Sequence, residues 1–134
     1  EIMSNLKFIY KNNEPLDKLV DYILSFKNLE ALLLIGELGA GKTTLTSQIA
    51  KKLNEPKTVI SPTFNTILVY DKFVHIDAYK LTTNLFAYED YFEDKLAIIE
   101  WAENVTLPKF KHYIKIKVYF DNEQNHVFEV MEEQ

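Results

Sequence analysis

The chain has 134 residues, of which 47% are hydrophobic and 26% charged, a balance typical of one soluble globular domain with its own core. It contains no cysteine, which excludes disulfides, thiolate metal sites and catalysis by a cysteine nucleophile. All 15 basic residues are lysines, so any contact that needs a bidentate guanidinium has to come from another molecule. The net charge of -5 argues against non-specific binding to nucleic acid through bulk charge.

A single domain is expected over residues 1–134. If Met3 is the native start, Glu1 and Ile2 precede the natural chain. No apolar run approaches the roughly 18 residues that cross a bilayer, and no signal-peptide pattern opens the sequence. We therefore expect no membrane partner and a cytoplasmic location.

Hydrophobic periodicity predicts alternating strands and helices. In chain order, the patterns predict a strand at 6–10, a helix at 16–26, a strand at 31–35, a helix at 42–53, strands at 66–70 and 73–77, a helix at 82–95, a strand at 96–100 and a terminal hairpin formed by 113–120 and 126–130. The strand at 31–35 is apolar throughout, as expected of a strand that is buried on both faces. The alternation of strands and helices is typical of an α/β fold with a mixed sheet.

The three glycines of the chain lie within six residues, directly after that buried strand. Residues 36–43 satisfy G-x-x-x-x-G-K-[ST], the signature of a phosphate-binding loop. In such a loop the backbone N–H groups converge on phosphate oxygens at the start of the next helix. Lys42 is expected to bridge the outer phosphates, and the Thr43 hydroxyl is a natural magnesium ligand. We predict nucleotide contacts from Gly36, Glu37, Leu38, Gly39, Ala40, Gly41, Lys42, Thr43 and Thr44.

A triphosphate site also needs acids that hold magnesium and orient the attacking group. Glu100 and Asp77 each end an apolar run, and the carboxyl ends of strands face the ligand crevice in open α/β sheets. The segment 61–63, Ser-Pro-Thr, could close over the γ-phosphate but is by itself an ordinary proline turn. Trp101 follows Glu100 directly and fits either a core or a ligand-edge role, and His75 is interpreted as a packed strand histidine.

Four blocks of the sequence, at 36–44, 61–64, 75–79 and 99–101, together resemble the TsaE family. The resemblance implies a phosphate-loop NTPase-like three-layer α/β fold with a mixed central sheet and a C-terminal β-hairpin. It also implies a magnesium-dependent ATPase, weakly active alone, that works with TsaB and TsaD. In that system TsaD transfers the threonylcarbamoyl group onto an adenosine of tRNA, so tRNA is reached indirectly, through the complex.

Carried over by position, the resemblance implies roles for Lys42, Thr43, Thr63, Asp77, Glu100 and Trp101. Lys42 would hold the phosphates of ATP, while Thr43 and Glu100 would hold Mg²⁺. Thr63 would be the hydroxyl that senses the γ-phosphate, and Asp77 would be the second catalytic acid. Trp101 would be a further residue needed for activity.

Two positions depart from the family pattern, because Lys80 stands where an arginine is usual and 122–126 lacks a Gly-Arg pair. Two other functions stay open. A small-molecule or nucleoside kinase shares the same loop, but such kinases usually clamp the transferred phosphate with several arginines. A nucleotide-switched binding module without significant hydrolysis would keep its function after Glu100→Gln. Low turnover of an isolated ATPase would follow from the absence of an arginine finger in the chain.

Overall fold

The fold is described from a computed structural model, which covers residues 5–37, 39–60, 67–79, 85 and 90–134. Leu38, Thr63 and Lys80 lie outside these residues. The strands are β1 (Lys7–Tyr10), β2 (Ala31–Gly36), β3 (Ile67–Val69), β4 (Phe73–Asp77), β5 (Leu96–Glu100), β6 (Tyr113–Phe120) and β7 (His126–Glu133). The helices are α1 (Asp17–Leu24), α2 (Lys42–Lys52) and the short 3-10 helix η2 (Ala102–Asn104). These bounds confirm the predicted strands and the first two predicted helices.

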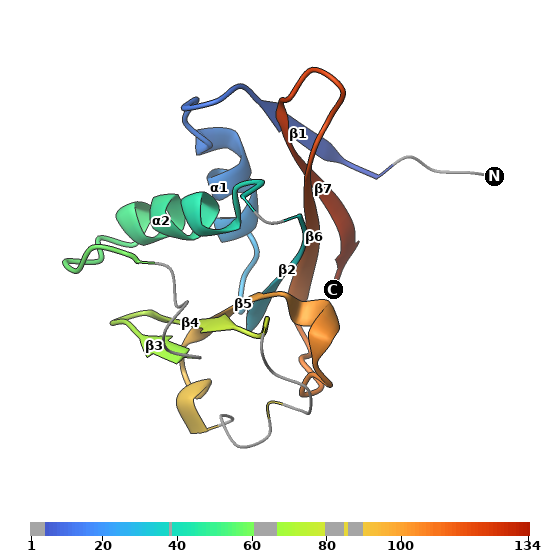
Figure 1. The fold of residues 1–134 in the computed structure, drawn as a ribbon. Helices are drawn as coiled ribbons and strands as arrows, with labels where there is room; N and C mark the ends of the chain where they lie inside the picture. The colour runs from blue at the N-terminus through green and yellow to red at the C-terminus, as the bar shows by residue number, and fades with distance from the viewer. Residues whose placement is uncertain (1–4, 38, 61–66, 80–84, 86–89) are drawn as a thin grey trace.

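Within the described residues the strands form one mixed sheet in the order β1-β7-β6-β2-β5-β4-β3 (Figure 1). The central strands β6, β2, β5 and β4 run parallel. Antiparallel strands flank these four: β7 and then β1 follow β6 on one side, and β3 follows β4 on the other. Because parallel strands end at the same edge, the sheet brings the carboxyl ends of β2, β4 and β5 together, which is where ligands bind in open α/β sheets.

Both faces of the central sheet are covered. Helices α1 and α2 pack on one face over the larger apolar core, to which Leu32, Leu34 and Ile98 contribute from the strands (Figure 1). On the other face, residues 31, 33 and 97 join a second core with chain that lies between β4 and β6, including η2. The three-layer α/β architecture expected from the sequence is therefore confirmed.

The predicted helix at 82–95 is wrong for the part of that range that the structure describes, Leu85 and 90–95. Residues 90–95 form a 3-10 turn followed by hydrogen-bonded turns. Two features explain the difference: the Leu85 N–H donates to the carbonyl of Thr106 instead of to a helical neighbour, and Asp94 adopts a left-handed backbone with φ of 61°. Packing of Leu85 and Phe92 against the sheet outweighs the helical spacing.

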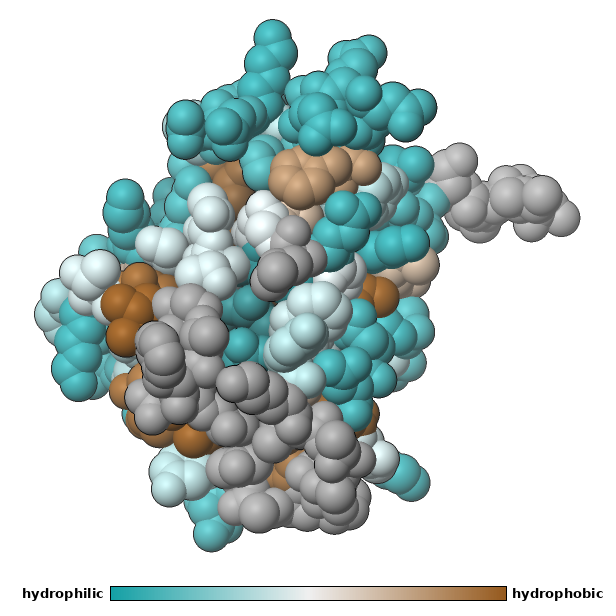
Figure 2. All heavy atoms as spheres, viewed as in Figure 1, coloured by the Kyte–Doolittle hydropathy of each residue, from teal (hydrophilic) through white to brown (hydrophobic). Residues whose placement is uncertain are grey.

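The exposed surface carries large hydrophobic side chains at scattered positions. Those among the described residues are Leu6, Ile9, Ile60, Val69, Tyr79, Tyr91 and Met131. Figure 2 shows one face of the molecule, on which hydrophilic side chains surround small, separated hydrophobic patches. Neither described α-helix has the length and hydropathy that a bilayer crossing requires.

Candidate functional site

The glycine-rich loop joins the end of β2 to the start of α2, and its backbone requires glycine. Gly36, Gly39 and Gly41 have φ of 118°, 77° and 127°, a region that residues with a side chain rarely adopt. At Gly36 a Cβ atom would also lie 2.1 Å from the carbonyl oxygen of Val118, on the neighbouring strand β6. Only glycine allows β2 to stay paired with β6 while the chain turns into the loop.

Lys42, the first residue of α2, points back into this loop. Its ammonium donates hydrogen bonds to the carbonyl oxygens of Gly36, at 2.8 Å, and Glu37, at 3.0 Å. It also lies 4.1 Å from the centre of the Trp101 ring, a cation–π contact, and the residue is only 4% exposed. Burial lowers the pKa of Lys42, and nearby carboxylates, Glu100 foremost, oppose that shift. A mostly buried cation therefore sits in the loop, where it can contact an anion.

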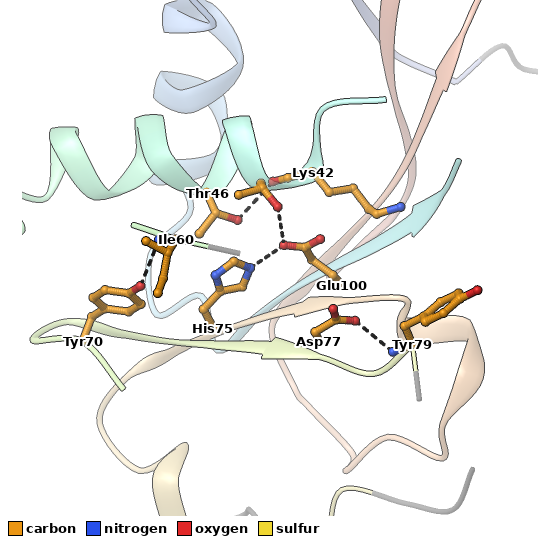
Figure 3. A network of polar contacts seen from close by, with 9 residues as sticks. Lys42, Thr46, Ile60, Tyr70, His75, Asp77, Tyr79 and Glu100 are labelled. Atoms are coloured by element: carbon orange, nitrogen blue, oxygen red, sulfur yellow. Dashed lines mark hydrogen bonds and ion pairs between the residues drawn. The ribbon is translucent and has the colours of Figure 1, made fainter. Parts of the chain in front are cut away.

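Glu100 ends β5 and lies under the start of α2 (Figure 3). The residue is 5% exposed, and its Oε2 accepts two hydrogen bonds, from Thr43 Oγ1 at 3.1 Å and from His75 Nε2 at 2.5 Å. The predicted pair of magnesium ligands, Thr43 and Glu100, is thus in direct contact. A hydroxyl and a carboxylate are both oxygen ligands of the kind that Mg²⁺ prefers.

In the described part of the chain, such an ion would find two oxygen ligands, Thr43 and Glu100. Within the part of the chain that the structure describes, His, Cys, Asp and Glu side chains form no group of three suited to hold a metal. Mg²⁺ usually binds proteins through one or two carboxylates and completes its shell with phosphate oxygens and water. The donor set of Thr43 and Glu100 fits an ion that arrives with a nucleotide.

Asp77 ends β4, next to Glu100 in the sheet. The two residues are paired in the parallel register of β4 and β5, so alternation places both side chains on the face that carries α2. The Oδ1 atom of Asp77 accepts a hydrogen bond from the N–H of Tyr79 at 2.9 Å, which holds the turn that follows the strand (Figure 3). The sequence-based pairing of these two acids at one edge agrees with this geometry.

Trp101 follows Glu100 with a left-handed backbone, φ 58° and ψ 41°. A non-glycine residue in this region costs about 1–3 kcal/mol, and such strain clusters at functional sites. The turn leaves the indole between two partners: Lys42 on the loop and the ring of Tyr79, whose centre is 4.9 Å away. Trp101 also packs against the second core, so both roles considered from the sequence, a core contact and a place at the edge where the strands end, stay open.

Sequence reasoning missed one residue of the site, His75. It is fully buried in β4, as expected of a packed strand histidine, but it also contacts the carboxylate of Glu100. The signal was present in the sequence, because His75 lies two residues before Asp77 and strand alternation puts both on one face. Thr63, the predicted γ-phosphate contact, lies outside the described residues, as does Leu38.

A cavity of about 370 Å³ lies beside the loop, between it, the N-terminal segment and β7. It is lined by Gly39, Gly41 and Thr44 of the loop and α2, by residues 10–14 and by the hairpin residues His126 and Phe128. His126 joins the three parts, since its Nδ1 lies 2.6 Å from the carbonyl oxygen of Ala40 and its Nε2 lies 3.2 Å from Asn12 Oδ1. The hairpin and the N-terminal segment thus form one wall of the loop region.

Comparison with known proteins identifies relatives along nearly the whole chain. The family model described as threonylcarbamoyl adenosine biosynthesis protein TsaE matches residues 10–128. The TsaE protein of Aquifex aeolicus is 35% identical over 102 residues, covering 71% of this chain and 75% of the relative. That of Bacillus subtilis is 32% identical over 136 residues, covering 94% and 86%. The crystal structure of Bacillus subtilis YdiB superimposes with a TM-score of 0.66 at 27% identity, covering 98% of this chain and 90% of that one. These matches show that the chain belongs to the TsaE family.

Proposed function

We propose that this protein is a magnesium-dependent ATPase that supports threonylcarbamoyladenosine modification of tRNA by driving turnover of a TsaB–TsaD complex. The observation that carries the proposal is the contact of Thr43 with Glu100 at the start of α2, whose first residue, Lys42, brings its ammonium into the glycine-rich loop. The names of the relatives supply the pathway, since the matched proteins are called tRNA threonylcarbamoyladenosine biosynthesis proteins.

In this reading the chain holds the phosphates of ATP and orients an attacking water. Lys42 exchanges its contacts with the loop carbonyls for contacts with the outer phosphates, and the N-terminus of α2 adds its positive end. Bound Mg²⁺ would neutralise charge on the phosphates, with Thr43 and Glu100 as its protein ligands. Asp77, beside Glu100 in the sheet, is the acid available to orient the water.

The cavity beyond Thr44 is the proposed place for the nucleoside. It shares Gly39, Gly41 and Thr44 with the loop, and its β7 wall lies on the opposite side of β2 from the strand β5 that carries Glu100. Its walls combine the aromatic ring of Phe128 with polar groups such as Asn12, a composition typical of sites that hold a base and fix its orientation. Its volume of about 370 Å³ falls within the range of small-molecule pockets.

A partner is needed because the chain contains no arginine. Phosphoryl transfer builds charge on the γ-phosphate oxygens, and an arginine finger supplied in cis or in trans stabilises it by about 10³–10⁵ in kcat. We propose that TsaB and TsaD provide the missing stabilisation and the link to tRNA. The net charge of -5 argues against this chain being the main contact for tRNA.

The test is ATP hydrolysis by the protein alone and with TsaB and TsaD, for the natural chain, Glu100→Gln and the control Glu132→Gln, on the exposed end of β7. We expect weak activity alone, strong stimulation by the partners, and loss of that stimulation in Glu100→Gln only. Negligible hydrolysis in every mixture would overturn the ATPase. Nucleotide binding without hydrolysis would then favour the switch, and phosphate transfer to a small acceptor would favour the kinase.

A further inference from the structure

His75 is a buried polar side chain that packing alone does not explain. It has no exposed surface, and its neighbours along β4 on either side, Val74 and Ile76, are also fully buried. Burying a polar group is unfavourable unless it is hydrogen-bonded, so an apolar residue would satisfy packing at lower cost. Within the described residues Nδ1 has no hydrogen-bond partner, which leaves the contact of Nε2 with Glu100 as the compensating interaction.

The contact restricts the carboxylate of Glu100. The Oε2 atom of Glu100 accepts one hydrogen bond from Thr43, on α2, and another from His75, on β4. One hydrogen bond would leave the carboxylate free to rotate about its terminal bond, whereas two donors from different elements fix its plane. In Figure 3 the other oxygen, Oε1, points away from His75. Within the described residues both hydrogen bonds of the carboxylate go to Oε2, so the protein holds Oε2 and leaves Oε1 for a ligand.

We propose that His75 is a positioning residue for the ATPase reaction: by donating Nε2–H to Glu100 Oε2, it holds the carboxylate in the orientation in which it serves the metal and water. The proposal rests on the proposed function and deepens it. His75 has no direct contact with nucleotide in this scheme and acts only through Glu100. Partners that orient a ligating carboxylate in this way typically account for 10–100-fold in metal affinity or activity.

Two substitutions separate orientation from packing. His75→Phe keeps a planar ring in the buried space but removes the donor, while His75→Gln keeps an N–H near the position of Nε2. With partner-stimulated hydrolysis as the readout, we expect His75→Phe to lower kcat about 10–100-fold with little change in the KM for ATP. We expect His75→Gln to recover most of that loss. Thermal unfolding and binding of ADP measured on the same samples report whether each variant is folded and competent to bind.

A second measurement tests whether His75 acts through Glu100. In the Glu100→Gln background, His75→Phe is expected to cause no further loss of kcat, because the carboxylate that it positions is gone. An unchanged kcat in His75→Phe would overturn the proposal, and so would equal losses in the Phe and Gln variants or additive losses in the double variant. Failure of the proposed function looks different, since the natural chain itself would then show no partner-stimulated hydrolysis.

Discussion

Replacement of Gly36 by alanine tests how the phosphate loop is built into the sheet. The φ of 118° costs a residue with a side chain about 1–3 kcal/mol. The new Cβ would lie 2.1 Å from the Val118 carbonyl oxygen, where real contacts stay beyond 3.0 Å, so β6 has to move by almost 1 Å. That carbonyl also accepts a 3.1 Å hydrogen bond from the Glu37 N–H, worth about 1 kcal/mol. We expect Gly36→Ala to lower the free energy of unfolding by about 2–4 kcal/mol.

Gly39→Ala is the matched control, because it lies in the same loop with φ of 77° and an added Cβ would meet no described atom within 4 Å. It carries only the backbone cost, about 1–2 kcal/mol. Urea unfolding of both variants, followed by circular dichroism, gives the two free energies directly. Equal destabilisation by the two substitutions would refute the reasoning, since it would mean that the approach of Gly36 to β6 carries no energetic weight.

Three further perturbations follow from burial and charge. Because burial lowers the pKa of Lys42, we expect the affinity for ADP to begin to fall at a lower pH than it would with an ordinary lysine, whose pKa is about 10.4. A binding titration from neutral to alkaline pH checks this. Burial and a hydrogen bond to Glu133 raise the pKa of Tyr22 to about 12. Between pH 10.0 and about 12 the folded protein therefore keeps the tyrosine proton that the unfolded chain has lost. Its stabilising contribution is complete below the ordinary tyrosine pKa of 10.0 and is lost as pH rises toward 12; Tyr22→Phe should remove this part of the pH dependence in urea unfolding. Ile98→Ala, at a fully buried position of β5, should cost about 2–5 kcal/mol in the same assay, against about 0.5 kcal/mol or less for the exposed Ile60→Ala.

The local elements of the fold could be predicted because their patterns are determined by short-range rules. The apolar run at 31–35 predicts a strand that is covered on both faces, and β2 has both cores against it. The alternation over 113–120 predicts a half-buried strand, and β6 presents Ile114 and Ile116 to the α1–α2 side. The turn from β2 into α2 could be predicted because the positive φ angles of its glycines are a local requirement of the backbone.

What the sequence did not reveal depends on contacts between distant segments. The helical spacing at 82–95 competes with packing on the sheet and with a hydrogen bond to Thr106, and neither is visible in the local pattern. The strand order that inserts β6 and β7 between β2 and β1 likewise depends on long-range pairing. Strand alternation places His75 on the face of Asp77, but its contact with Glu100 also depends on the register that sets β4 beside β5.

The charge balance of the site bears on how it would bind nucleotide. Within the described residues, the ammonium of Lys42 lies under the influence of four carboxylates, those of Glu37, Asp77, Glu100 and Glu103. An incoming polyphosphate adds further negative charge, and the N-terminus of α2 offers only about half an elementary charge in return. We therefore expect nucleotide binding to depend on a cation that arrives with the nucleotide, and chelation of Mg²⁺ to lower the affinity for ATP at least tenfold, about 1.4 kcal/mol. Equal affinity with and without the metal would mean that these acids do not face the phosphates, which would remove the electrostatic basis for assigning Glu100 to the metal.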